Sequence, residues 1–505
     1  MRAMKRALPF VCCSIVAFAA CGGGDSAPDA NVSPPPAACT APTQLVDTTG
    51  GHPIGDGTAA SCTEAALDAA LAMGGVVYFD CGDAPVTITT TAEKVIAMNT
   101  VLDGGEKVTL DGGGTHRLFT IRAAVDAVEP ILTVQRLTFA HGQGPAIAGG
   151  GGAIARVGGT LIVNDCVFSD NHGTQSGGDV AGGAISSQGL AATLVVGSVF
   201  TGNSASSGGA LGNAGNPTRI FNSRFTGNTA TGTGGAGGNG GAVSVTASGA
   251  TLEICGSTFT GNQAKGGLGG AVVHVGSAAE TTSITRSTFK DNTAPTGEPG
   301  GGGGVYLSGS PVTVAQAAFV GNKARTGGGL YVDGVGVTLA VEASTFEGNE
   351  ATSTSGGGLA VATGVTGTMS GVTISKNKAA SGGGIGGGGA TGITLANSII
   401  AANEAGAMGA NCEATFLDGG GNLVFPDEPT FACAQGAMKV DPLLGALTEL
   451  PFEGGTDTTW VVIPQTGSPA LGGGATNCGL ADQRGKERPL PCTLGAVEPV
   501  PAAMP

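Results

Sequence analysis

Two aspartates in this chain of 505 residues occupy the same place in a repeated pattern, and they are the first candidates for chemistry. Asp170 follows Phe168 by two residues and Asp291 follows Phe289 by two, while the other copies have glycine there. Glycoside hydrolysis needs two carboxyl groups that face one bond. The two aspartates are four copies apart, which is about 19 Å at one strand spacing per copy. We therefore predict that they do not act as a pair.

Other reactive residue types show no spacing that is typical of a catalytic or metal site. The chain has five scattered histidines, and neither a G-x-S-x-G motif nor a phosphate-loop lysine motif occurs. Residues 232–237 match G-x-G-x-x-G, but no strand-to-helix context accompanies them, and chance matches are expected among 95 glycines. We predict no catalytic residues, no metal site and no cofactor. The histidines are His52, His116, His141, His172 and His274.

The charge balance limits the choice of partner. Lys and Arg number 22 against 37 Asp and Glu, which gives a net charge of −15. Because no basic stretch is present, we expect no nucleic-acid partner. Hydrophobic residues make up 41% of the chain, which is enough to bury a large core.

The N-terminus has the pattern of an export signal. A positively charged start is followed by the apolar run Ala7–Ala20, which is shorter than the roughly 20 residues that a membrane-spanning helix needs. The run ends in F-A-A-C at Cys21, which resembles a bacterial lipoprotein cleavage box except for its phenylalanine. We expect a signal peptide over 1–20, a lipid on Cys21 and a flexible tether over 21–44, with the protein at the outer membrane or cell surface. The alternative is an ordinary signal peptide with a chance cysteine.

Export makes disulfides possible, so we expect some of the later cysteines to be paired. The central Cys166 and Cys255 are three copies apart, about 14 Å by the same spacing, which is too far for a disulfide. We predict that both are buried thiols, and Cys39 has no evident partner. The three local pairs expected are Cys62 with Cys81, Cys412 with Cys433, and Cys478 with Cys492.

The pattern that contains the aspartates is an internal repeat of 25 to 34 residues. Each copy has a phenylalanine followed three residues later by asparagine, and then a glycine pair, a small residue and an aliphatic residue. Two further copies have isoleucine, Ile374 and Ile400, in place of phenylalanine. The phenylalanines are Phe168, Phe200, Phe225, Phe259, Phe289, Phe319 and Phe346, and the asparagines are Asn171, Asn203, Asn228, Asn262, Asn292, Asn322, Asn349, Asn377 and Asn403.

Short alternating apolar runs separated by Gly, Asn and Ser predict strands and tight turns in each copy. One copy cannot bury its own apolar face, so stacked copies are expected to form an all-β, right-handed parallel β-helix of about ten or more coils. We expect the phenylalanines to stack inside, the asparagines to occupy left-handed turns and bond between coils, and the glycine pairs to form corners. The residues after four consecutive asparagines should form a surface ladder of alternating charge: Lys323, Glu350, Lys378 and Glu404.

Both ends of such a helix must be covered. We predict an N-terminal cap with a short helix and first coils over 45–135, repeat coils over 136–405, and an irregular disulfide-bonded C-terminal cap over 406–505. Three segments resemble known families. V-T-L-D-G-G-G-T-H-R-L-F from Val108 is similar to the opening coils of pectate-lyase-like proteins, and the repeats are similar to those of chlamydial polymorphic outer-membrane proteins.

The last hundred residues resemble the bacterial choice-of-anchor Q domain. The matching motifs are D-P-L-L-G at 441–445, I-P-Q-T-G-S-P-A at 463–470, D-Q-R-G at 482–485 and G-A-V-E at 495–498. In that family an anchoring segment commonly follows G-A-V-E. Only P-V-P-A-A-M-P follows here, so the resemblance implies that the anchor is the lipid at Cys21.

These observations favour a non-catalytic surface lipoprotein with an adhesin-like or structural role. The expected partners are the membrane, through the lipid, and an extracellular polysaccharide or a surface protein, with the protein itself a monomer. The alternative is a polysaccharide lyase or glycoside hydrolase, because many parallel β-helices have such activities. Lyases of this architecture use acidic calcium clusters with an Arg or Lys base, and the sequence shows no such cluster.

Overall fold

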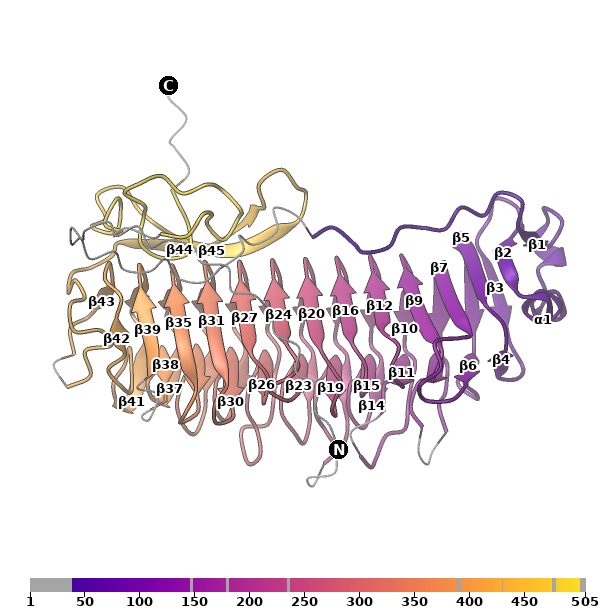
Figure 1. The fold of residues 1–505 in the computed structure, drawn as a ribbon, viewed down its shortest axis with the longest axis horizontal. Coiled ribbons are helices and arrows are strands. Elements are labelled where there is room, and N and C mark those ends of the chain that lie inside the picture. Colours follow the sequence, from indigo (N-terminus) through magenta and orange to yellow (C-terminus); the bar gives the residue numbers. More distant parts are fainter. Residues whose placement is uncertain are drawn as a thin grey trace, which may run out of the picture. The chain divides into compact units, whose positions relative to one another are not determined.

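The computed structural model describes residues 39–145, 149–178, 181–233, 237–387, 392–428, 430–474 and 478–499. These residues fold as an all-β parallel solenoid of about 12 turns, in which each strand pairs with its equivalent in the next turn (Figure 1). The predicted fold class is confirmed. The predicted lipidation site, Cys21, lies outside the described residues.

The first coil is preceded by the predicted capping helix. The chain forms β1 (His52–Ile54), the short 3-10 helix η1 (Ala59–Ser61), α1 (Glu64–Met73) and β2 (Gly75–Phe79). Thr63 caps α1 by accepting a hydrogen bond from the Ala66 amide at 3.2 Å, and the helix ends at Gly74, whose φ is 66°. Cys62 and Cys81 form the predicted disulfide across this unit.

The largest sheet contains 25 strands among the described residues, and all of its pairings are parallel. Most coils contribute two strands to it, joined by a sharp corner. After β1 and β2 its strands are β3 (Val86–Thr89), β5 (Thr100–Asp111), β7 (Ile131–Ala140), β9 (Thr160–Asn164), β10 (Val167–Ser169), β12 (Thr193–Val196), β13 (Val199–Thr201), β16 (Thr218–Phe221), β17 (Arg224–Thr226), β20 (Leu252–Cys255), β21 (Thr258–Thr260), β24 (Thr282–Thr285), β25 (Thr288–Lys290), β27 (Val312–Ala315), β28 (Ala318–Val320), β31 (Thr338–Glu342), β32 (Thr345–Glu347), β35 (Thr366–Ser370), β36 (Thr373–Ser375), β39 (Gly392–Ala396), β40 (Ile399–Ala401), β42 (Leu417–Asp418) and β43 (Leu423–Phe425).

A second parallel sheet forms another side of the coils, and short ladders continue beyond the asparagine positions. The second sheet consists of β4 (Lys94–Ile96), β6 (Phe119–Arg122), β8 (Ile154–Val157), β11 (Ile185–Gln188), β15 (Leu211–Ala214), β19 (Val243–Thr246), β23 (Val272–Val275), β26 (Val305–Ser308), β30 (Leu330–Asp333), β34 (Leu359–Val361) and β38 (Ile385–Gly386). The short ladders are β14 (Ser204–Ala205), β18 (Thr229–Ala230) and β22 (Gln263–Ala264), and then β29 (Lys323–Ala324), β33 (Glu350–Ala351), β37 (Lys378–Ser381) and β41 (Glu404–Met408).

The repeated phenylalanines form one continuous stack inside the coils. From Phe139 to Phe346, successive ring centroids lie 4.6 to 5.0 Å apart with nearly parallel planes. Phe119 packs edge-on against Phe139 at the start, and the buried Ile374 and Ile400 continue the column at the other end. The period in the sequence is therefore the period of the core.

The repeated asparagines form a second interior column. The Asn262 side chain accepts hydrogen bonds from the backbone amide and Nδ2 of Asn228, and donates to Asn292 and to the Phe225 carbonyl, at 2.9 to 3.0 Å. The predicted bonding between coils is confirmed, but the predicted left-handed conformation is wrong. The positive φ falls one residue earlier, at glycine in five of the nine coils, at Asp170 and Asp291 in two, and at Lys376 and Ala402 in the last two, because that residue turns the chain before the asparagine points inward.

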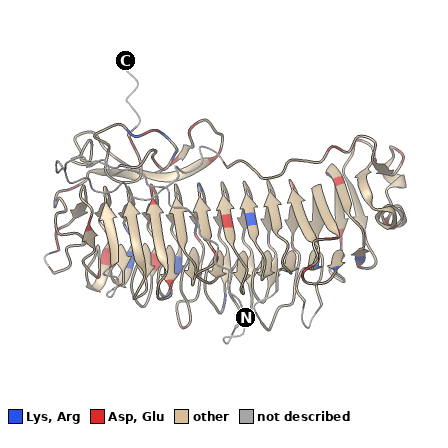
Figure 2. Cartoon of the chain, in the orientation of Figure 1, with Lys and Arg blue, Asp and Glu red and all other residues tan. Residues whose placement is uncertain are grey.

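The glycine pairs and the charge ladder take the places expected of them. Gly269 has φ +65°, and a Cβ on Gly270 would lie 1.9 Å from the Gly303 carbonyl oxygen of the next coil. Lys323 pairs with Glu350 at 2.8 Å, and the next pair of the ladder, 378 with 404, is 3.7 Å apart. Figure 2 shows few charged residues on the strands. Because the side chains of these ladder pairs are exposed, the pairs contribute little to stability.

Candidate functional site

An N-terminal strap, residues 39–47, lies across stacked corners of the largest sheet (Figure 1). Its backbone exchanges two hydrogen bonds with Gln135, at 2.9 and 3.0 Å, and accepts a third from Asn164 one coil on. Cys39 then forms a disulfide with Cys255, the last residue of β20. The strap thus follows the coil axis and joins residues that are 216 positions apart.

The disulfide corrects two expectations. Cys255 is not a free thiol, because the strap brings Cys39 to it. The spacing of the copies excludes only a bond between Cys255 and Cys166. The tether expected over 21–44 is attached to the coils from Cys39 onward. Cys166 is a buried free thiol as predicted, and burial raises its pKa to about 12.

A C-terminal cap, residues 444–499, lies along the same corners beyond the strap (Figure 1). Its antiparallel hairpin consists of β44 (Leu444–Pro451) and β45 (Thr458–Pro464). The Gln316 side chain donates to the Asp482 carbonyl, and the Ala496 amide donates to the Thr373 hydroxyl, both at 2.9 Å. The cap therefore lies on the side of the coils, whereas the sequence predicted an irregular cover for the open end.

The two remaining predicted disulfides are confirmed. Cys412–Cys433 lies in the last turns, where Cys412 also bridges to Ile385 and so extends the second sheet. Cys478–Cys492 lies within the cap.

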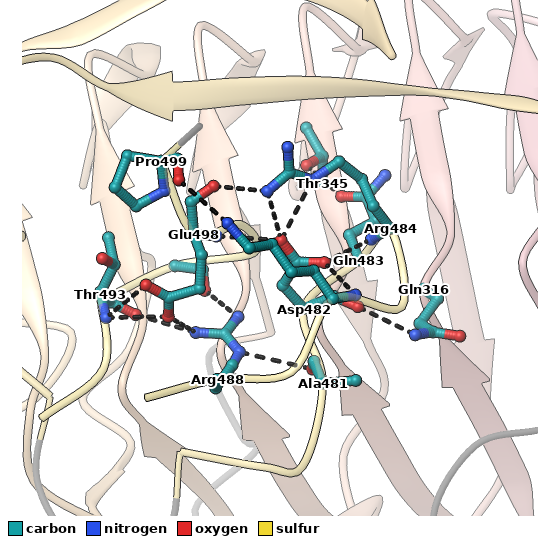
Figure 3. Close-up of polar contacts among 12 residues, drawn as sticks. Gln316, Thr345, Ala481, Asp482, Gln483, Arg484, Arg488, Thr493, Glu498 and Pro499 are labelled. Atoms are coloured by element: carbon teal, nitrogen blue, oxygen red, sulfur yellow. Dashed lines mark hydrogen bonds and ion pairs between the residues drawn. The ribbon is translucent and has the colours of Figure 1, made fainter. Parts of the chain in front are cut away.

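The D-Q-R-G and G-A-V-E motifs meet in a buried network within the cap (Figure 3). Asp482 accepts hydrogen bonds from the Arg484 guanidinium at 2.6 Å and from the Glu498 amide at 3.1 Å. Arg488 pairs with the Glu498 carboxylate at 3.4 Å and donates to the Gly495 carbonyl, and burial lowers the pKa of Arg488. Each charge in this network has a partner, so these motif residues hold the cap together.

Gln483 connects that network to both the hairpin and the coils. Its side-chain Oε1 accepts from the Thr345 hydroxyl at 2.5 Å, and its side-chain Nε2 donates to the Trp460 carbonyl at 3.0 Å. On the outer side, the Lys290 ammonium lies 4.4 Å from the centre of the Trp460 ring. The hairpin is therefore fixed over β25 and β32.

Where the hairpin tip meets the coils just beyond the strap, a junction cavity of about 300 Å³ remains. The coil side of the cavity carries two guanidinium groups, Arg224 and Arg286, with the Thr258 hydroxyl. The hairpin side carries the exposed carboxylates Glu449 and Asp457. Its other lining residues are Asn222, Ser223, Gly256, Phe452, Thr456 and Thr458.

Arg286 is the unusual group of this cavity. Arg286 is only 7% exposed, and its guanidinium carbon lies 4.1 Å from the centre of the Phe452 ring. Its Nη1 atom is buried without a hydrogen-bond partner. Burial lowers the pKa of Arg286, and the negative charge of Asp457 opposes that shift.

The other residue types considered for chemistry stay apart. Asp170 and Asp291 lie in different coils, with β13, β17 and β21 between their strands β10 and β25. His274 is buried inside the coils, bonded to the Thr282 hydroxyl and the Ala250 carbonyl. In the described ranges, no group of three or more His, Cys, Asp or Glu could hold a metal ion.

No known family, curated protein or solved structure matches this chain in the comparisons made. No helix in the described part of the chain is long and apolar enough to cross a membrane.

Sequence reasoning overlooked the junction cavity. The one signal was the corner position of Arg286, a positive-φ position that is glycine in some coils, such as Gly256, and a polar residue in others: Arg136, Asp165, Asn222 and Gln316. A polar residue held in that conformation is worth attention because it costs energy that glycine avoids.

Proposed function

We propose that this protein is an exported, lipid-tethered scaffold of the cell envelope with an adhesin-like or structural binding role. The observation that carries the proposal is the Cys39–Cys255 disulfide, which attaches the end of the tether to β20, a strand with paired coils on both sides. A lipid on Cys21 would then be separated from the coils by residues 22–38. A flexible chain of that length spans about 20–25 Å.

The attachment point gives this arrangement a functional meaning. A tether that leaves from the strap, alongside β20, holds the coils by their side, so the second sheet stays available to a partner. Four disulfides among the described residues also support an oxidising compartment outside the cytoplasm. We assign the cap to the choice-of-anchor Q type on its motifs, and in this proposal its role is to clamp the coils from the side.

Replacing the predicted lipid attachment residue tests the anchor. Cys21→Ser should abolish incorporation of labelled palmitate and release the protein from the membrane fraction. Cys13→Ser, a change within the apolar run, should leave both unchanged. Membrane retention and labelling of the Cys21→Ser variant would contradict the proposal.

The non-catalytic role is tested by incubating the purified protein with a panel of polysaccharides. We expect saturable binding or none, without new reducing ends or unsaturated products. Turnover that is abolished by Asp457→Asn or Glu449→Gln would instead establish the enzymatic alternative, since these are the carboxylates of the junction cavity.

A further inference from the structure

We propose that the junction cavity binds a small zwitterion, with its carboxylate on Arg286 and its ammonium group between Glu449 and Asp457. This site goes beyond the scaffold role and does not depend on the lipid anchor. The inference rests on three features: a buried guanidinium whose Nη1 atom has no hydrogen-bond partner, carboxylates on the facing wall, and the size of the space between them.

The guanidinium of Arg286 specifies the anionic end of the ligand. A buried charge is costly unless it is both paired and hydrogen-bonded. Arg286 is buried, and its Nη1 atom has no hydrogen-bond partner. Phe452 covers one face of the guanidinium, so a ligand must approach its in-plane N–H groups. Those donors match the two oxygens of a carboxylate.

The neighbouring wall residues support the same orientation. Arg224 adds a second positive charge on the coil side, and Thr258 adds a hydroxyl from β21. The remaining wall comes from the loop between β44 and β45, which is held closed by the Phe452 amide donating to the Asp457 carbonyl at 2.9 Å. The cavity is thus formed by two segments that are both anchored.

The two exposed carboxylates specify the cationic end. Glu449 and Asp457 lie on the hairpin side, and Glu449 accepts a hydrogen bond from the Thr458 hydroxyl at 2.5 Å. A simple anion would be attracted by the arginines and repelled by these carboxylates, whereas a zwitterion is attracted by both walls. A volume of about 300 Å³ suits a ligand of dipeptide size.

One buried water would not remove the need for a ligand. Gln316 Oε1, at the corner stacked on Arg286, is also buried without a partner, so a water could bridge it to Nη1. A guanidinium has five N–H donors, so one water cannot satisfy all of them.

Titration calorimetry of the purified full-length chain with three probes tests the site. Dialanine carries both charges, N-acetyl-dialanine lacks the ammonium, and dialanine amide lacks the carboxylate. We expect dialanine to bind saturably and each derivative to bind about tenfold or more weakly, which is the size expected for hydrogen bonds to charged groups. Arg286→Gln should weaken dialanine by a similar factor, whereas Arg122→Gln, an exposed arginine elsewhere, should not.

The outcomes that overturn the proposal are specific. They are no saturable binding of dialanine, equal binding of dialanine and N-acetyl-dialanine, or unchanged binding by a folded Arg286→Gln variant. Should Arg286→Gln fail to fold, the exposed Asp457→Asn variant decides. Because Glu449 remains, it should discriminate less between dialanine and N-acetyl-dialanine than the unchanged protein does, and unreduced discrimination would refute the site. Membrane release of Cys21→Ser is measured separately, so failure of the anchor and failure of this site are distinguishable.

Discussion

The coils and the cap differ in how they satisfy buried polar groups. In the coils, each buried asparagine bonds to the same residue type one coil away, so one solution is repeated along the stack. In the cap, Asp482, Arg488 and Glu498 bond to different partners within a short segment, and no neighbour repeats the arrangement. Repetition spreads stability over many equivalent contacts, whereas the cap depends on a few that cannot replace one another.

The largest effect is therefore expected in the cap. Glu498→Ala leaves Arg488 buried without its carboxylate, and breaking a buried pair costs about 3–5 kcal/mol. Hydrogen exchange should accelerate in β44 and β45 while β20 stays protected. Glu487→Ala, an exposed glutamate beside the same arginine in sequence, is the control and should change neither. Equal acceleration in β20 would show that the cap and the coils unfold together.

A change in the asparagine column should lower the stability of the coils. Asn262→Ala removes the acceptor of two buried Asn228 donors and the side-chain donor to Asn292 and to the Phe225 carbonyl, which predicts a loss of about 2–4 kcal/mol in the free energy of unfolding. Thermal and denaturant unfolding would measure it, with the exposed neighbour Gln263→Ala as control. A loss below 1 kcal/mol would mean that adjacent coils rearrange to restore the bonds.

The strap combines features of the cap and of the coils, because it is a segment that occurs once and contacts several repeated corners. Cys39→Ser removes a crosslink across 216 residues, for which about 2–3 kcal/mol is expected. Limited proteolysis should then cut within 39–47 while the coils persist. Thr40→Ser keeps the disulfide and is the control. A strap that stays resistant would be held by its hydrogen bonds to Gln135 and Asn164 and by the packing of its apolar residues, without the disulfide.

The same contrast explains how much the sequence predicted. Phe259 and Asn262 could be placed inside the coils because their period specifies their neighbours, and α1 and the Cys62–Cys81 pair could be placed because their contacts are local in sequence. Cys39 with Cys255 and Gln316 with Asp482 could not, since one partner in each pair belongs to a segment that occurs once. The junction cavity lies between the coils and the hairpin of the cap, which occurs once in the chain. The repeat pattern therefore could not predict it.

The smallest expected effect is a pH dependence of the unfolding free energy that comes from a buried histidine of the coils and not from the cap. Burial lowers the pKa of His274, which is neutral in the folded state and bonded to Thr282 and Ala250. Unfolded histidine takes up its proton near pH 6.5, so the folded state loses stability as the pH falls below that value until it reaches the lowered folded pKa.

His274→Gln should therefore flatten the dependence of unfolding free energy on pH just below 6.5, and exposed His52→Gln should not. The neighbouring Glu280 does not confuse the measurement. Hydrogen bonds, chiefly from the Gly249 amide, lower its pKa, so its contribution is lost only as the pH falls below the ordinary glutamate range. An unchanged slope in His274→Gln would assign the acid sensitivity to other groups of the molecule.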